Sequence, residues 1–364
     1  MVSQFSKVSV DFTKEKTKKF LKENGIFFTP KFHRDELLKQ IHPFIRDGIR
    51  ILEPSVGSGE FVKDLLSQYG TVVALHIDAI ELNGELFNYV NTLDGCNAIH
   101  DDFITRQFGS REKYDIILGN PPYFELGKKS EYYAASVPCN RRTNIYSMFI
   151  LKSIALLKEG GVLAFIIPPS WMNGKYYEPV RAELSRQGTV LYMADFSTTN
   201  TFMKTQQDTM LLVFQRGRGR ADEDRYKLTI NHKIFYTFQK VDILNLMRKS
   251  TTIKRLQAHV RTGPCVWNQM KDKLFDDPSK GVPLIYSNNI QGRQIVLHDS
   301  MARGKKQYVV ANENQIFQHS SIVMNQALAK GRTIAWNSRY VGYPNTPVKI
   351  IPMLLSPRPK KYYN

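Results

Sequence analysis

The chain has 364 residues, 42% of them hydrophobic and 23% charged, which is ordinary for a globular protein with room for two domains. No apolar run approaches the roughly 18 residues of a membrane span, and the polar, Lys-rich first 22 residues lack the apolar segment of a secretion signal. Three widely spaced cysteines, Cys96, Cys139 and Cys265, argue against a disulfide framework and a zinc site. We therefore expect a cytoplasmic protein without a structural metal.

The formal net charge of +18 is concentrated in one part of the chain. Residues 1–215 carry 25 Lys and Arg against 24 Asp and Glu, a net +1, whereas residues 216–364 carry 26 against 9, a net +17. This partition predicts an electrically balanced catalytic body and a second domain that binds a polyanion, with nucleic acid as the best candidate. The segment 215–220 breaks all periodicity, so we expect domains at 1–220, with an N-terminal arm at 1–25, and at 221–364.

Short apolar runs alternate with helix-like stretches between residues 49 and 215, which is the pattern of a parallel sheet covered on both faces. The expected strands are 49–53, 72–81, 98–100, 114–119, 162–167, 190–196 and 209–215. Beyond residue 250 the pattern weakens into mixed strands and loops.

Residues that commonly end or begin helices predict the positions of two helices. Apolar residues recur at helical spacing from 145 to 157, and Gly160-Gly161 is expected to end that helix as a C-cap pair. Another helix is expected to begin near Lys31, with Pro30 at its start and Thr29 as its cap.

A glycine turn follows the first expected strand. Residues Glu53-Pro54-Ser55-Val56-Gly57-Ser58-Gly59 have the form of a nucleotide-type site at the carboxyl end of that strand. The P-loop pattern and the full G-x-G-x-x-G pattern are both absent, so a pyrophosphate ligand is not favoured. Gly57 and Gly59 allow the backbone close to a ligand, and the Glu53 charge suits a cationic amino-acid sulfonium.

The next two strands each end in an acid. Glu81 stands where an acid can bind a ribose diol. Asp102 could accept the amino group of an adenine, and Phe103 could cover its ring. The alternatives are a solvated carboxylate at Glu81, a helix N-cap at Asp102 and a core side chain at Phe103.

The most informative segment is Asn120-Pro121-Pro122-Tyr123, directly after the apolar run 114–119. Two prolines fix φ and remove two N–H donors. The Asn120 amide oxygen and the neighbouring carbonyls then become acceptors for one planar NH₂ group. Tyr123 offers a ring face for a flat heterocycle, as in enzymes that modify flipped bases. The alternative is an ordinary strand with a Pro-rich turn.

Together these motifs resemble the gamma-class N6-adenine DNA methyltransferases of restriction-modification type, in the order that class uses. Phe28-Thr29-Pro30 looks like the N-terminal cofactor motif of that class, and residues 53–59 look like its first S-adenosylmethionine motif. Glu81 stands at the matching ribose position, and Asp102-Phe103 stands at the adenine position. Residues 120–123 are similar to the catalytic motif, and residues 144–149 with 160–163 match the stretch that follows it. Phe202 lies where the class has a second base-stacking aromatic, with Phe196 as the alternative. The resemblance covers 26–215 well and is looser at 261–264 and 283–286.

The resemblance implies an α/β fold: a Rossmann-like, seven-stranded S-adenosylmethionine-dependent methyltransferase domain, then a mixed α+β target-recognition domain that is short for the class. It implies direct methyl transfer from S-adenosylmethionine to the N6 amino group of a flipped-out adenine in double-stranded DNA. We expect a monomer, in a bacterial or virus-infected cell, with a cognate restriction endonuclease as a functional but not a physical partner.

The same comparison assigns roles to individual residues. For the cofactor these are Thr29, Pro30, Glu53, Pro54, Ser55, Gly57, Gly59, Glu81, Asp102, Phe103 and Asn120; for catalysis Asn120, Pro121, Pro122 and Tyr123; for base stacking Tyr123 and Phe202. The candidates for DNA contact are Arg293, Arg303, Lys305, Lys306, Lys330 and Arg332.

Other substrates stay open. The same set of acceptors at residues 120–123 fits the N4 amine of cytosine, the N6 amine of adenine in RNA and the side-chain amide of a protein glutamine. The net +17 of residues 216–364 weighs against the protein substrate. A non-catalytic nucleic-acid-binding protein with a degenerate methyltransferase fold is a further alternative, against which the intact motifs at 53–59 and 120–123 argue.

Overall fold

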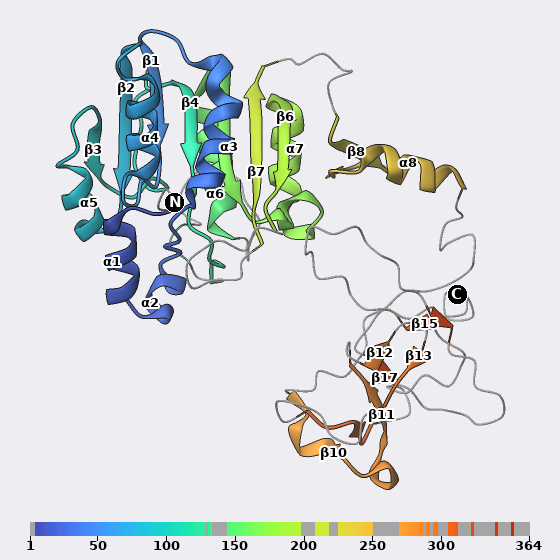
Figure 1. The fold of residues 1–364 in the computed structure, drawn as a ribbon. Coiled ribbons are helices and arrows are strands. Elements are labelled where there is room, and N and C mark those ends of the chain that lie inside the picture. The colour runs from blue at the N-terminus through green and yellow to red at the C-terminus, as the bar shows by residue number, and fades with distance from the viewer. Residues whose placement is uncertain are drawn as a thin grey trace. The chain divides into compact units, whose positions relative to one another are not determined.

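The computed structural model describes residues 4–127, 130, 132, 144–197, 208–217, 225–249, 269–286, 289–291, 294–297, 305–311, 322–323, 339–340 and 351–352 (Figure 1). The chain divides into two compact units, Met1–Ile243 and Leu244–Asn364. The boundary expected at residue 220 stays a prediction.

A seven-stranded sheet with the order β3-β2-β1-β4-β5-β7-β6 forms the centre of the first unit (Figure 1). The strands are β1 (Ile49–Glu53), β2 (Leu75–Glu81), β3 (Asn97–His100), β4 (Tyr114–Gly119), β5 (Leu157–Ile167), β6 (Gly188–Asp195) and β7 (Met210–Arg216). All seven expected strands are present. The sheet is not wholly parallel, however, because β7 runs antiparallel to both β5 and β6. The consecutive pairs β1–β2, β2–β3 and β4–β5 are parallel, and each parallel pair needs a crossover connection, whereas the consecutive strands β6 and β7 pair antiparallel and need none.

Helices cover both faces of this sheet. They are α3 (Lys31–Ile41), α4 (Glu60–Tyr69), α5 (Gly84–Val90), α6 (Ile145–Leu156) and α7 (Glu178–Gln187). On one face α3 and α4 pack against Ile116 and Leu118 of β4, and on the other α6 and α7 pack in the cluster that contains Ile117. β4 is therefore buried on both faces, which explains its continuous apolar sequence.

Two helix ends differ from expectation. α6 ends at Leu156, and Gly160 and Gly161 lie inside β5 instead of capping the helix. A Cβ atom on Gly161 would lie 3.1 Å from the carbonyl oxygens of Tyr114 and Asp115, so close backbone approach explains the small residue. α3 begins at Lys31 as expected, but Pro30 takes the N-cap position without a side-chain hydrogen bond, and Thr29 is not the cap.

The N-terminal arm folds into α1 (Lys7–Glu15) and α2 (Lys18–Glu23). The side chains of Ser6 and Thr17 accept hydrogen bonds from the backbone N–H groups of Ser9 and Phe20, which caps both helices. A small core of Phe12, Leu21, Phe28 and Leu86 packs the arm against α5. Figure 1 shows α1 and α2 at the carboxyl ends of the parallel strands.

The remaining elements are shorter. In the first unit they are η1 (His42–Phe44), η3 (Pro169–Met172), η4 (Lys175–Tyr177) and the hairpin β8 (Lys227–Ile230) with β9 (Lys233–Tyr236); α8 (Lys240–Lys249) spans the division between the units. None of the described helices is long and apolar enough to cross a membrane.

The second unit contains a four-stranded sheet of β10 (Leu274–Phe275), β14 (Tyr308–Val309), β11 (Val282–Ile285) and β17 (Ile351–Pro352). It also contains η7 (Lys271–Lys273), η8 (Pro278–Lys280), and the pairs β12 (Ile290–Gln291) with β13 (Gln294–Ile295) and β15 (Ile322–Val323) with β16 (Arg339–Tyr340). Leu274, Leu284, Tyr286 and Val309 form its small described core.

Candidate cofactor and catalytic site

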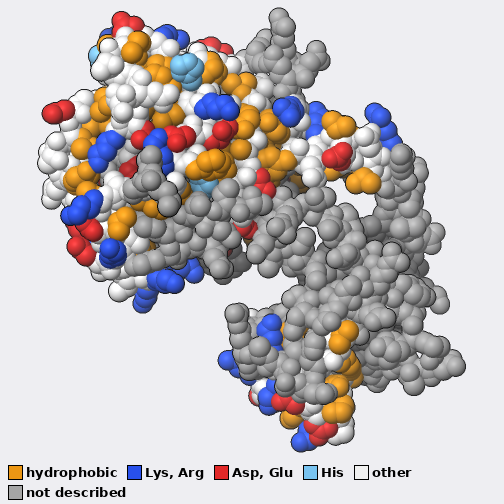
Figure 2. Space-filling model, in the orientation of Figure 1, with side chains coloured by type: hydrophobic (Ala, Val, Ile, Leu, Met, Phe, Trp, Pro, Cys, Tyr) orange, Lys and Arg blue, Asp and Glu red, His pale blue; other side chains and the backbone are white. Residues whose placement is uncertain are grey.

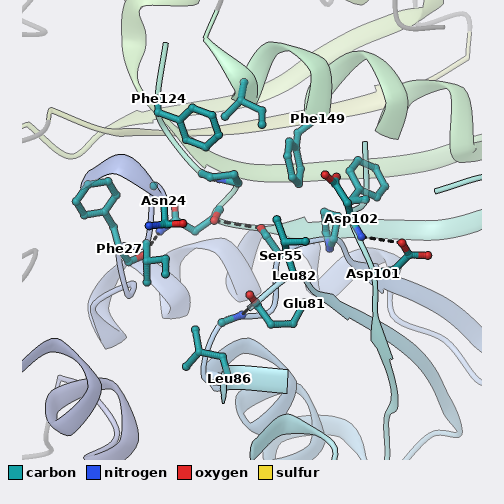
Figure 3. Close-up of a pocket in the computed structure, with 18 of the residues that line it drawn as sticks. Asn24, Phe27, Ser55, Glu81, Leu82, Leu86, Asp101, Asp102, Phe124 and Phe149 are labelled. Carbon is teal, nitrogen blue, oxygen red and sulfur yellow. Dashed lines mark hydrogen bonds between the residues drawn. The ribbon is translucent and has the colours of Figure 1, made fainter. Parts of the chain in front are cut away.

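A pocket lies at the carboxyl ends of β1 to β4, which is where open α/β sheets bind ligands (Figure 3). Most of its lining residues lie at or after the ends of these strands: Pro54, Ser55, Gly57, Glu81, Leu82, Asp101, Asp102, Phe103, Asn120, Pro122 and Phe124. The segment that leaves the N-terminal arm contributes Asn24 to Phe28. The remaining lining residues are Leu86 of α5, Ile145 and Phe149 of α6, and Tyr132. Many of the predicted site residues thus share one pocket. The other described residues with a predicted cofactor or catalytic role, Thr29, Pro30, Glu53, Gly59, Pro121 and Tyr123, lie outside its lining.

Glu81 joins the glycine turn to the loop after β2. Its carboxylate accepts the backbone N–H of Gly57 at 2.8 Å and that of Asn83 at 2.8 Å. Gly57 and Gly59 have φ values of +58° and +72°, a left-handed conformation that favours glycine. Burial raises the pKa of Glu81, and the two N–H donors oppose that shift. Each carboxylate oxygen keeps a further lone pair for a ligand.

Glu53 is a buried carboxylate at the end of β1, only 2% exposed. Its Oε2 atom has no hydrogen-bond partner among the described residues. Burial, together with the neighbouring Glu81, raises the pKa of Glu53 well above its usual range. A carboxylate in such surroundings is stabilised by a nearby cation. A Cβ atom on Gly119 would lie 3.5 Å from Glu53 Cγ, so this acid sits beside the backbone that leads into Asn120.

Asp102 lies at the opposite side of the pocket from Asn24 and Phe27 (Figure 3), and the next residue, Phe103, also lines the pocket. The Asp102 carboxylate accepts the N–H of Ile104 at 2.8 Å, which gives the loop a tight turn. The ring of Phe103 packs on that of Phe149 with centroids 4.9 Å apart. This end of the pocket therefore combines two acids, Asp101 and Asp102, with two aromatic rings.

Lys152 of α6 holds this loop from behind, a role that was not predicted from the sequence. Its Nζ donates to the carbonyl oxygens of Ile104 at 2.8 Å and Arg106 at 2.6 Å, and lies 5.4 Å from the centre of the Phe103 ring. Burial lowers the pKa of Lys152 to about 8, although Asp102 and Asp101 oppose the shift. The available signal was a lone lysine in the apolar stretch 145–156.

The Asn120 side chain is oriented by the arm's exit. Asn120 Nδ2 donates to the carbonyl oxygen of Phe27 at 2.7 Å. A carbonyl can only accept, so the amide nitrogen must face Phe27, and Oδ1 must face the other way as an acceptor. The Tyr123 hydroxyl donates to this Oδ1 and to the Ile166 carbonyl, 2.8 Å away. One phenolic proton serves only one of these acceptors at a time.

The Tyr123 ring is 8% exposed, which differs from an open stacking platform. Phe27 stacks on it with centroids 5.8 Å apart and an interplanar angle of 16°, and Tyr146 meets it edge-on at 6.4 Å. Phe196, the alternative stacking residue, is buried against His33 at 4.1 Å in the core beneath α3. Phe202 lies outside the described residues.

Gly25 brings the arm against the loop 120–123. With φ +64°, it places its Cα so close that a Cβ atom would lie 2.7 Å from Pro122 Cβ and 2.9 Å from the Tyr123 nitrogen. The sequence shows only a glycine after a helix, and the contact with residues 122–123 could not be read from it.

A buried polar network fixes the arm to the start of α4. Arg34, 6% exposed at its side chain, donates to Glu60 at 2.9 Å and to Asp64 at 2.7 Å. Glu60 also accepts the backbone N–H of Ser6 at 2.6 Å and the hydroxyl of Ser9 at 2.7 Å. The arm is thus attached directly behind the glycine turn.

Of the basic residues expected to contact DNA, Lys305 and Lys306 are described. The Lys305 ammonium lies 5.0 Å from the centre of the Tyr286 ring, and the Lys306 carbonyl accepts the Tyr286 hydroxyl at 2.9 Å. Arg293, Arg303, Lys330 and Arg332 lie outside the described residues.

Known proteins resemble this chain in sequence. Residues 66–202 match the family model described as Eco57I restriction-modification methylase. Modification methylase CviBIII of Paramecium bursaria Chlorella virus NC1A is 29% identical over 340 residues, 91% of this chain and 81% of that protein. Type II methyltransferase M.CvrRI of Paramecium bursaria Chlorella virus XZ-6E is 29% identical over 309 residues, 84% of this chain and 78% of that protein.

Two solved structures resemble part of this chain at low sequence identity. A class I S-adenosylmethionine-dependent methyltransferase from Listeria monocytogenes matches 58% of this chain and 65% of its own, with 14% identity and a TM-score of 0.48. A type I restriction-modification system methyltransferase subunit from Streptococcus thermophilus matches 62% of this chain and 54% of its own, with 16% identity and a TM-score of 0.43.

Proposed function

This chain is a relative of the restriction-modification methylases, and we propose that it transfers a methyl group from S-adenosylmethionine to the N6 amino group of a flipped-out adenine in double-stranded DNA. The predicted resemblance to restriction-modification methylases is confirmed. The chain has the predicted Rossmann-like methyltransferase fold, and S-adenosylmethionine is its cofactor. The proposal adds to these findings that the substrate is double-stranded DNA, that the modified base is adenine and that the methylated atom is N6.

The observation that carries the proposal is the fixed orientation of the Asn120 amide. Its nitrogen is held by the Phe27 carbonyl, which leaves Oδ1 as an acceptor at the edge of the pocket. An amino group of a base needs an acceptor there, because its N–H bonds must be held while its nitrogen attacks. A position preset in the free protein reduces the rearrangement needed at the reaction step.

The pocket also suits the cofactor. S-adenosylmethionine supplies, when bound, a methyl group on a positively charged sulfur. We assign the recognition of its positive charge to Glu53, which lies outside the pocket lining, directly before the lining residue Pro54, and whose Oε2 is buried without a partner in the described part of the chain. Glu81 has the lone pairs for the ribose hydroxyls, and Asp102 with Phe103 and Phe149 has the acceptor and the rings for the adenine.

The reaction needs a better nucleophile than a free adenine offers, because the amino lone pair is delocalised into the ring. Two N–H donations, to Asn120 Oδ1 and to the Pro121 carbonyl, would draw the nitrogen toward tetrahedral geometry and free its lone pair. The bound cofactor would supply the methyl group for the new N–C bond, and the amino nitrogen would release one proton to solvent. Positioning and electrostatics thus supply the catalysis, without a covalent enzyme intermediate.

Side-by-side methylation assays test the proposal. Purified protein is given radiolabelled S-adenosylmethionine with duplex DNA, structured RNA or a release factor, and the modified position is mapped. We expect label on adenine N6 of DNA. Label on cytosine would show that the proposed base is wrong. Transfer to RNA or protein but not to DNA would overturn the proposal that DNA is the substrate. Sequencing modified DNA from an expressing host then identifies the recognition motif.

A further inference from the structure

We propose that the arm formed by α1 and α2 is a second DNA-contacting element, which binds backbone phosphates at the mouth of the catalytic pocket. The inference rests on the proposed function, because it takes DNA as the substrate. It adds an element of the catalytic unit to the contacts expected from residues 216–364.

The charge of the catalytic body is unevenly distributed. Residues 1–25 contain six lysines against three acidic residues, a net +3, whereas residues 26–215 contain 19 basic against 21 acidic residues, a net −2. The near-neutral total of residues 1–215 therefore conceals a basic arm on a slightly acidic body. Local positive charge of this kind is the electrostatic feature that phosphate binding requires.

Three of the six lysines of the arm make no ion pair with a described residue, and Lys7 pairs with Asp11 at 3.4 Å. Lys14, Lys18 and Lys22 are exposed, and none of them makes an ion pair with another described residue. Lys19 reaches Glu23 only at 3.9 Å, while Lys16 is held by Glu85 at 2.6 Å. Figure 2 shows blue side chains along the lower left edge of the catalytic unit, where α1 and α2 lie.

The arm ends at the pocket itself. Asn24 and Gly25, which directly follow α2, line the pocket, and Gly25 packs against Pro122 and the Tyr123 backbone. Lys22 is joined to this exit, since its carbonyl accepts the Gly25 N–H at 3.3 Å. Lys18 and Lys22 are four residues apart and share one face of α2. A nucleotide whose base enters the pocket brings its flanking phosphates to this rim.

The arm is also held in place before any ligand binds. The bonds from Ser6 and Ser9 to Glu60, and the core of Phe12, Leu21, Phe28 and Leu86, attach it to the body. Cations on a fixed element need less ordering on binding than cations on a free tail. The fixed position of the arm therefore supports a role of its lysines in binding phosphates, instead of a role in solubility alone.

The test compares two double variants that remove the same amount of charge. Lys18→Gln/Lys22→Gln removes the exposed cations of α2, and glutamine keeps a helix propensity close to that of lysine. Lys39→Gln/Arg111→Gln is the control: Lys39 is in the last turn of α3 and Arg111 precedes β4, so both lie toward the amino ends of the strands, away from the pocket. Affinity for short duplexes of random sequence is measured by fluorescence anisotropy over a salt series.

We expect the arm variant to bind DNA several-fold more weakly than the control at low salt. Its slope of log-affinity against log-salt should be shallower by about one for each phosphate that the variant no longer binds. S-adenosylmethionine affinity and melting temperature should match the wild type.

Equal DNA affinities and equal salt slopes for the two variants would overturn the proposal that the arm binds DNA phosphates. Binding of an acidic protein to the arm in place of DNA would overturn it as well. If the wild type methylates DNA and only the arm effect is missing, the proposed function stands. If the wild type neither binds nor methylates DNA, both proposals fail.

Discussion

Asn120 donates a hydrogen bond to the backbone carbonyl of Phe27, 93 residues earlier in the chain and 2.7 Å away. This bond links the loop after β4 to the exit of the N-terminal arm. The orientation of the Asn120 amide therefore depends on a segment that lies outside the central sheet.

Replacing Asn120 by Ala should abolish detectable methyl transfer, with a rate reduction of at least about 100-fold, because both the acceptor and its orienting bond disappear. The affinities for S-adenosylmethionine and DNA should change little, and single-turnover kinetics would separate chemistry from binding. Asn91→Ala, an exposed asparagine after α5, is the control. Retained activity in Asn120→Ala would refute the assigned role.

Two glycine variants separate backbone strain from contact with the catalytic loop. Gly25 and Gly48 have nearly equal φ values, +64° and +68°, so alanine should destabilise each by about 1–2 kcal/mol through its backbone. A Cβ atom meets Pro122 and the Tyr123 backbone at Gly25, and nothing within 4 Å at Gly48. We expect Gly25→Ala to reduce the methylation rate well beyond its effect on melting temperature, and Gly48→Ala to reduce stability alone. Equal activities at matched stability would contradict this account.

Replacing Lys152 by Met should weaken S-adenosylmethionine binding several-fold, because the carbonyls of Ile104 and Arg106 lose their donor and the loop with Asp102 and Phe103 loosens. Burial lowers the pKa of Lys152 to about 8 from 10.5, so the unfolded chain holds the proton more tightly. Between those values the free energy of unfolding of the wild type should rise with pH relative to the Met variant. Urea titrations across this range test the sign, and a parallel pH profile for both proteins would argue against it.

Replacing Glu53 by Gln should reduce affinity for S-adenosylmethionine more than for S-adenosylhomocysteine, whose sulfur is uncharged. The shape of the side chain is kept, and only its ability to carry a negative charge beside the bound sulfonium is removed. Burial and Glu81 raise the pKa of Glu53, so the free wild type should lose stability as pH rises above about 4.5 through that raised pKa, and the Gln variant should lose less. Calorimetric titration with both ligands gives the affinity ratio. An unchanged ratio would remove Glu53 from charge recognition.

The parts of the site that are local in the chain could be predicted from the sequence. β1 and β4 have the expected bounds because strands buried on both faces read as continuous apolar runs. The reversal of β7 could not be predicted, because apolarity carries no strand direction. The prediction for Gly160-Gly161 was wrong because a glycine pair after a helix looks the same whether it caps the helix or lets two backbones approach.

The contributions of Phe27, Gly25 and Lys152 could not be predicted for a related reason. Each acts through a contact with residues far away in the sequence, namely Asn120, Pro122 and Ile104. Periodicity and local motifs hold no information on such contacts.

The two acceptors of the Tyr123 hydroxyl have a consequence for substrate entry. In the free protein this hydroxyl serves Asn120 Oδ1 and the Ile166 carbonyl in turn. When an amino group arrives at Oδ1, the hydroxyl can settle on Ile166 without being left unsatisfied in a buried site. Binding then exchanges one hydrogen bond for another, so the Oδ1 acceptor keeps a donor both before and after the substrate enters.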